Sequence, residues 1–81
     1  MEFSAHTPEQ LGAILRGFRR ERRLTQQQLA SKVGLAQKAI SVAETHPERM
    51  GLSRLFQLLA ALDVELALRD KAAQRRPRTE W

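Results

Sequence analysis

The side chains that could carry catalysis are few in this 81-residue sequence, which has two histidines and no cysteine. His6 precedes the first helical pattern and His46 directly precedes Pro47, so we expect both to be solvent-exposed bystanders. Neither histidine has carboxylates at metal-ligand spacing, and Gly34 stands alone where a phosphate-binding loop needs several glycines. The residues therefore predict no enzyme, no metal site and no other cofactor.

Basic side chains are abundant instead, and the formal net charge is +5. A positive balance predicts a polyanionic partner, either nucleic acid or, as the weaker alternative, an anionic membrane surface. No apolar run approaches the ~20 residues of a membrane-spanning helix, and residues 1–6 lack the pattern of a signal peptide. We expect a soluble cytoplasmic protein associated with the nucleoid. The arginines on or beside the polar surface of the first helix are Arg16, Arg19, Arg20, Arg22 and Arg23.

Apolar residues recur at helical spacing, and polar signals mark where each helix begins. The apolar sides of the four helices are Leu11, Ile14, Leu15 and Phe18; Leu29, Ala30 and Val33; Ile40 and Ala43; and Leu52, Leu55, Phe56, Leu58, Leu59 and Leu62. Thr7 with Gln10, and Thr25 with Gln28, have the spacing of capping boxes. Gly34 stands where a left-handed helix terminator is needed. The sequence therefore predicts an all-α protein with helices over about 8–22, 26–33, 36–45 and 52–62.

The period of the pattern changes after the last of these helices. Val64, Leu66 and Leu68 alternate with polar or small residues, which is typical of a strand over about 64–70. A lone strand leaves its backbone unpaired, so we expect it to pair with the same strand of a second copy in a homodimer. The alternative is that this segment extends the preceding helix.

The ends of the chain have no core-forming pattern. We expect a loose N-terminus over residues 1–6 and one folded DNA-binding and dimerisation domain over residues 7–70. The basic tail over residues 71–81 is interrupted by Pro77 and is predicted to be disordered in isolation. Trp81 is its only aromatic residue, which is either a meaningless end or an anchor for a pocket on a partner protein.

The segment from Gln26 to Glu44 has the layout of a helix-turn-helix. Two short helical patterns meet at Gly34, and Ala30 supplies the small side chain needed where they approach. The alternative is an ordinary helical hairpin, but the positive charge and the arginine-rich flank favour the DNA-binding motif. The apolar residues expected to fix the helix crossing are Val33, Leu35 and Ile40.

Specific residues in this segment resemble the helix-turn-helix family of phage repressors and Xre-type regulators. They are Leu24-Thr25-Gln26-Gln27-Gln28-Leu29-Ala30, Val33-Gly34-Leu35, Ile40 and Glu44. The resemblance covers about residues 11–64 and implies a lambda-repressor-like bundle. The order of four helices, one strand and a tail ending in Glu80-Trp81 more narrowly resembles the HipB-type antitoxins, which pair with HipA-type kinase toxins.

This resemblance implies that the third helix enters the major groove of DNA. Gln37, Lys38 and Ser41 occupy its base-contacting positions; glutamine suits adenine, and lysine suits the acceptors of guanine. Gln26 matches a phosphate-contacting position at the start of a helix. Arg16, Arg20 and Arg23 are further candidates for phosphate contacts, although runs of charge are often only solvated surface.

Two positions depart from the family pattern, and two others match an interior ion pair. Ala36 replaces the usual Ser or Thr before the third helix, which removes a cap worth about 1 kcal/mol. Thr45-His46-Pro47 replaces the usual Asn-Gly turn, which puts the loop geometry in doubt. Arg19 and Glu44 match a structural ion pair between the first and third helices; the alternative is two solvated charges.

The resemblance therefore predicts a dimeric antitoxin and repressor that binds palindromic operator DNA of its own operon. Its second partner would be a HipA-like serine/threonine kinase toxin, contacted by Trp81 in the tail. No small-molecule substrate is expected. Two alternatives remain, namely a stand-alone Xre-type repressor without a toxin, and a protein-interaction module that no longer binds DNA.

Overall fold

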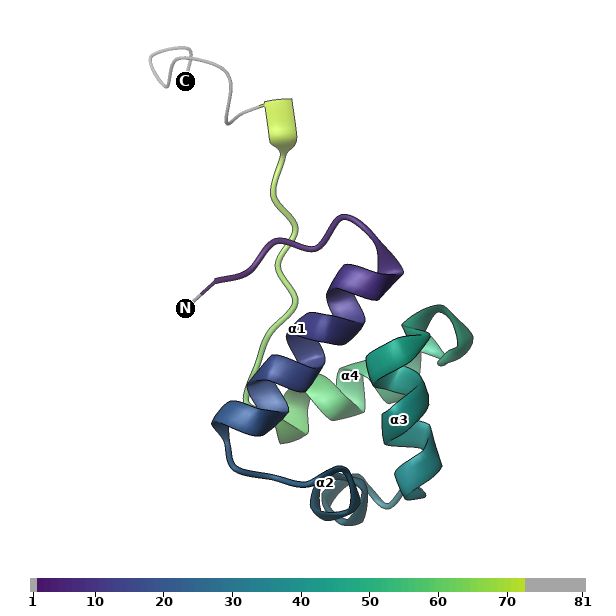
Figure 1. The fold of residues 1–81 in the computed structure, drawn as a ribbon. Coiled ribbons are helices and arrows are strands. Elements are labelled where there is room, and N and C mark those ends of the chain that lie inside the picture. Colours follow the sequence, from purple (N-terminus) through teal and green to yellow (C-terminus); the bar gives the residue numbers. More distant parts are fainter. Residues whose placement is uncertain (1, 73–81) are drawn as a thin grey trace.

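Helices account for nearly all regular structure in the part of the chain that the computed structural model describes, residues 2–72. They are α1 (Pro8–Glu21), α2 (Gln26–Val33), α3 (Gln37–Thr45) and α4 (Leu52–Ala61) (Figure 1). A short 3-10 helix, η1 (Pro47–Arg49), lies between α3 and α4. The four predicted helices and the all-α helix-turn-helix fold class are confirmed, and no helix end shifts by more than one residue.

Threonine hydroxyls cap the first turns of α1 and α2. Thr7 Oγ1 accepts from Gln10 N at 3.1 Å, and Thr25 Oγ1 accepts from Gln28 N at 3.0 Å. The box at α2 is complete, because Gln28 Oε1 accepts from Thr25 N at 2.8 Å. At α1 the second half of the expected box is wrong, because Gln10 Oε1 accepts from His6 N at 2.6 Å instead. The side-chain carbonyl of Gln10 thus accepts from the residue before Thr7 and not from Thr7 itself.

The core lies where the four helices meet. α3 packs against both α1 and α2, and α2 also contacts α4. Figure 1 shows α2 and α3 as two short helices joined by a tight turn, with α2 below α1 and α3 to its right. The buried apolar side chains are Leu15, Leu29, Ala30, Ile40, Ala43, Leu58, Leu59 and Leu62, all of them on the apolar faces that helical spacing defined.

Left-handed residues end three of the helices and turn the chain sharply into the next segment. Arg23, Gly34 and Asp63 have φ angles of 58°, 69° and 58°. After α1, the backbone N–H of Leu24 donates to the carbonyl of Arg19 at 3.2 Å, which is the long-range bond of a Schellman motif. Only Gly34 adopts this conformation without steric strain, because it has no β-carbon.

The apolar stripe of α4 is wider than one chain can cover. Leu58, Leu59 and Leu62 are buried, whereas Leu52 and Phe56 remain 65% and 48% exposed. The sequence placed all of these residues on one apolar side of the helix. Helical spacing defines such a side, but it does not say how much of that side neighbouring elements will cover.

Residues 64–70 form no strand in the described chain; they run as an irregular segment away from α4 (Figure 1). Val64 is half-buried, whereas Leu66 and Leu68 are 47% and 93% exposed. The expected strand is therefore absent from the single chain, because a β-ladder needs a second strand for its backbone groups. The alternative of a longer fourth helix is also not observed, and pairing across a homodimer stays a prediction.

The N-terminal segment lies beside this C-terminal segment (Figure 1). The Phe3 ring packs edge-on against Phe18 of α1, with centroids 5.5 Å apart and planes at 82°. Arg69 donates to Glu2 Oε1 at 3.2 Å and to Ser4 Oγ at 2.6 Å. The expected boundaries at residues 7 and 70 stay predictions, and most of the predicted tail, residues 73–81 with Trp81, lies outside the described residues.

Candidate nucleic-acid interface

The α2–turn–α3 unit is held by a close approach of small and branched apolar side chains. Ala30 of α2 and Ile40 of α3 are both fully buried. Gly34 turns the chain between them, and the backbone N–H of Leu35 donates to the carbonyl of Ala30 at 3.0 Å. This unit fixes the orientation of α3 relative to the core.

The first turn of α3 exposes the side chains expected to contact bases. Gln37 and Lys38 are exposed, while Ser41, one turn later, is half-buried. The opposite face of the helix carries Ile40 and Ala43, which are fully buried in the core. α3 thus presents polar groups on a rigidly supported surface, which is the arrangement that groove recognition requires.

An ion pair joins α1 to α3 in the interior of the domain. Arg19 Nε lies 2.6 Å from Glu44 Oε2, and Arg19 Nη2 donates to Glu44 Oε1 at 3.1 Å. The remaining guanidinium nitrogen, Nη1, donates to the carbonyl of Leu24 at 2.8 Å. The side chains of Arg19 and Glu44 are only 10% and 4% exposed. The structure thus brings together the two residues matched to an ion pair, and the alternative of two solvated charges does not occur.

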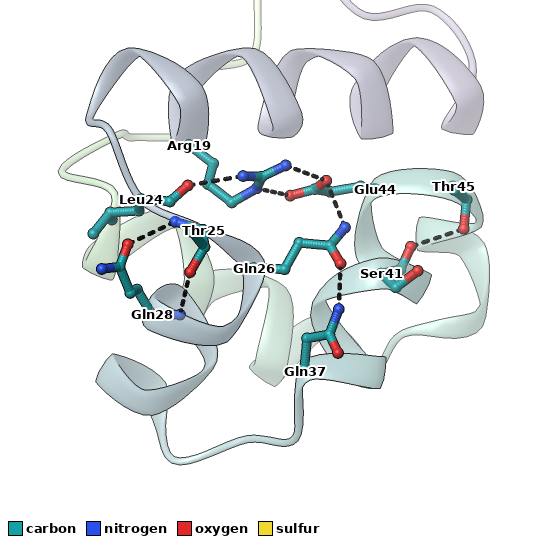
Figure 2. A network of polar contacts seen from close by, with 9 residues as sticks. All are labelled: Arg19, Leu24, Thr25, Gln26, Gln28, Gln37, Ser41, Glu44 and Thr45. Carbon is teal, nitrogen blue, oxygen red and sulfur yellow. Dashed lines mark hydrogen bonds and ion pairs between the residues drawn. The ribbon is translucent and has the colours of Figure 1, made fainter.

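Two glutamines extend this ion pair to the start of α3 (Figure 2). Gln26 Nε2 donates to Glu44 Oε1 at 3.1 Å. Gln37 Nε2 donates to Gln26 Oε1 at 2.8 Å. Gln26 was expected to face phosphate, but its half-buried side chain lies between the interior carboxylate and the exposed Gln37. A polar connection therefore runs from the core to the recognition surface.

The arginines of α1 and of the turn that follows it divide into two groups. The Arg22 side chain is engaged within the domain. Its Nε donates to the carbonyl of Leu62 at 2.6 Å, and its guanidinium lies 5.0 Å from the Phe18 ring centroid. The three arginines expected near phosphate are exposed, and within residues 2–72 none of them forms an ion pair. Their charges are thus available to a polyanion; they are Arg16, Arg20 and Arg23.

Sequence reasoning missed Gly12. Its position in α1 lies so close to the end of α3 that an added β-carbon would be 2.9 Å from the carbonyl carbon of Glu44. A signal was present, because glycine inside a helix costs about 1 kcal/mol relative to alanine and needs a packing reason. Gly17, in the same helix, has no atom within 4 Å of such a β-carbon. Only the three-dimensional structure distinguishes the two glycines.

Neither a metal centre nor a membrane-spanning segment is found in the part of the chain that the structure describes. No group of three or more histidine, aspartate or glutamate side chains is arranged to hold an ion. None of the described helices is long and apolar enough to cross a bilayer.

Comparison with known proteins agrees with this geometry. The helix-turn-helix family model HTH_3 matches residues 15–68. Antitoxin HipB of Escherichia coli strain K12 is 32% identical over 65 residues, covering 80% of this chain and 74% of HipB. HipB of Escherichia coli O6:H1 is also 32% identical over 65 residues, covering 80% of this chain and 69% of its own length. The chain belongs to the HipB-type antitoxins of the helix-turn-helix family.

Solved structures of HipB share the fold of this family member. A complex of a HipB variant with an O2 20mer has a TM-score of 0.80 at 30% identity, covering 88% of this chain and 99% of that chain. A HipA–HipB–O2–O3 complex has a TM-score of 0.79 at 30% identity, covering 86% and 99%. The likeness therefore extends beyond the helix-turn-helix motif to nearly the whole of the HipB chains.

Proposed function

We propose that this protein is a dimeric antitoxin and transcriptional repressor that binds palindromic operator DNA of its own operon. The observation that carries the proposal is the exposed start of α3, which is held against the core by the rest of the helix. Similar HipB chains were solved in complex with operator DNA, which supports the same function. In this arrangement α3 enters the major groove and each protomer reads one half-site. Two recognition helices about 34 Å apart reach successive major grooves on one DNA face.

Each side chain of the interface has a separate role in this proposal. Gln37 reads adenine through two hydrogen bonds, Lys38 addresses guanine acceptors, and Ser41 makes a looser contact. Arg16, Arg20 and Arg23 contact phosphates, which positions the protein without selecting a sequence. Gln26, at the first residue of α2, adds a phosphate contact through its backbone N–H at the helix N-terminus, because its side-chain amide is engaged by Glu44 and Gln37.

Fluorescence anisotropy with a duplex from upstream of the gene tests this function. We expect the native duplex to bind more tightly than a scrambled duplex, with two chains per site. Gln37→Ala with Lys38→Ala should abolish the preference, because base contacts carry specificity. Gln57→Ala is the control, since Gln57 is an exposed glutamine on α4, outside the helix-turn-helix unit.

Salt dependence separates specific recognition from charge alone. Each phosphate contact contributes about 0.9 to the slope of log affinity against log salt concentration. Weak binding that is equal on both duplexes and disappears with salt would contradict the repressor. That outcome would favour the rival protein-interaction module, in which the basic charge alone attracts DNA.

The second partner in this proposal is a HipA-like serine/threonine kinase toxin. The support is membership of the HipB-type antitoxins and the similar HipA–HipB–O2–O3 complex. Trp81, which lies outside the described residues, would fill a pocket of the kinase as an aromatic anchor. The protein would act by binding, not by catalysis, in the cytoplasm beside the chromosome.

Calorimetric titration with a HipA-like kinase tests this partnership. Deleting residues 71–81 should weaken kinase binding and spare operator binding, and Trp81→Ala should reproduce most of the loss. Thr79→Ala provides a control in the same segment. Wild-type protein that binds no kinase would reduce the function to that of a stand-alone repressor.

A further inference from the structure

The hydrogen bonds that connect the core to Gln37 have a fixed donor-to-acceptor order. They begin at Arg19, whose guanidinium contacts both oxygens of Glu44 at 2.6 and 3.1 Å. A carboxylate engaged in this way has only acceptor sites and no hydrogen-bond donor. Any neighbour that bonds to Glu44 must therefore donate a hydrogen to it.

This one-way chemistry fixes the orientation of the Gln26 amide. The nitrogen of Gln26 must face Glu44, as it does at 3.1 Å, and its carbonyl oxygen must then face Gln37 (Figure 2). The two ends of an amide are otherwise nearly equivalent in shape, so a neutral neighbour would allow either orientation. Glu44 thus determines that Gln26 offers Gln37 an acceptor and not a donor.

The next step fixes which groups of Gln37 remain for DNA. Gln37 Nε2 donates one hydrogen to Gln26 Oε1 at 2.8 Å. Within residues 2–72 no other hydrogen bond engages the Gln37 side chain, so one N–H and its carbonyl oxygen are available to DNA. Adenine presents one acceptor and one donor in the major groove, which complements this pair, whereas guanine presents two acceptors and needs two donors.

We propose that Glu44 is a positioning residue for base specificity, acting through Gln26 to hold Gln37 in the orientation that prefers adenine over guanine. The inference rests on the proposed operator binding. Without the carboxylate, Gln26 can rotate and donate its nitrogen to the Gln37 carbonyl. Gln37 then presents two N–H groups outward, which suits the N7 and O6 acceptors of guanine.

The experiment measures discrimination between bases, not affinity alone. Each A·T pair of the native duplex is replaced singly by G·C, and the ratio of the two dissociation constants is measured by anisotropy. At the pair read by Gln37 we expect a wild-type ratio of about tenfold or more in favour of adenine. Gln37→Ala identifies that pair, because the ratio there should fall to about one.

Two variants interrupt the connection at different points. Glu44→Gln removes the acceptor-only group, and Gln26→Met removes the amide while leaving the buried ion pair intact. Both should reduce the adenine preference to about twofold or less, and neither should change it further in a Gln37→Ala background. Gln27→Met is the control, because Gln27 is an exposed glutamine of the same helix.

The possible results separate specificity from stability. A merely structural role for Glu44 would weaken binding to the A·T and G·C duplexes by the same factor. If Glu44→Gln fails to fold, Gln26→Met still decides, because it leaves the ion pair in place. An adenine preference that survives in folded Gln26→Met would overturn this inference but leave the proposed operator binding standing. Wild-type protein with no base preference would overturn the proposed function, and this inference with it.

Discussion

Gly12 of α1 lies directly against the backbone carbonyl of Glu44, where a β-carbon would be 2.9 Å from the carbonyl carbon and still closer to the oxygen. This contact lets α1 and α3 approach more closely than side chains would permit. Glu44 is thereby brought within reach of Arg19, two turns further along α1. The missing side chain at Gly12 is thus a condition for the buried ion pair.

Gly12→Ala should destabilise the domain, because either α3 must shift or the new methyl group must overlap backbone atoms. We expect a loss of about 1–3 kcal/mol in the free energy of unfolding, measured by urea denaturation. Gly17→Ala is the matched control in the same helix. It should be neutral or raise stability by up to about 1 kcal/mol, because its β-carbon meets no atom within 4 Å. Equal effects of the two substitutions would contradict the close approach.

Arg19→Met should leave the carboxylate of Glu44 buried without its charged partner. Breaking a buried pair in this way costs about 3–5 kcal/mol, whereas replacing both partners with apolar residues can be nearly neutral. The double variant Arg19→Met with Glu44→Leu should therefore recover much of the loss. Arg20→Met, at the exposed neighbouring position, should change stability by less than about 0.5 kcal/mol. The denaturation curves of the wild type and the three variants form the test, and an Arg19→Met variant as stable as the wild type would show that the pair is dispensable.

The missing cap of α3 gives a stabilising prediction. Ala36 has extended backbone angles of −75° and 152°, which suit a capping residue, but it makes no side-chain hydrogen bond. Ala36→Ser should raise the free energy of unfolding by about 0.5–2 kcal/mol. Thr25→Ala, which removes the existing cap of α2, should lower it by a similar amount. Thermal melting of both variants measures the effects, and a serine that changes nothing would mean that its hydroxyl does not reach the first turn.

Much of this fold could be predicted because the relevant signals are local. Helical spacing gave the buried residues Leu15, Leu29 and Ile40, and capping signals such as Thr25 placed the helix starts to within a residue. The partners Arg19 and Glu44 followed from the family resemblance. Each of these inferences depends on residues close in sequence or on a known pattern.

Relationships between distant segments were harder to predict. Nothing local distinguishes Gly12 from Gly17, since only the backbone of α3 makes one of them essential. The place of Gln26 between Glu44 and Gln37 depends on how α2 packs against α3, so the sequence suggested only an outward-facing role for it. Helical spacing also could not show how much of the apolar side of α4 would stay exposed.

The segment 64–70 yields the clearest prediction about assembly. Leu66 and Leu68 lie on one side of this segment, and both are exposed in the single chain. A row of exposed apolar side chains in a folded protein indicates a surface that a partner covers. If this row pairs with its copy across a two-fold axis, each protomer buries the leucines of the other. A lysine at either position would then place a charge in that shared layer.

Leu66→Lys and Leu68→Lys should each raise the dimer dissociation constant at least about tenfold, a penalty of about 1.4 kcal/mol or more. Sedimentation equilibrium over a range of concentrations measures this constant. Ala67→Lys is the matched control, because it adds the same charge to the exposed opposite face of the same segment. Helix content should be unchanged in all three variants, because the leucines lie outside the helical core. If Leu66→Lys and Leu68→Lys remain dimers with the wild-type constant, the two copies must meet elsewhere, and the exposed Leu52 and Phe56 of α4 become the surface to test next.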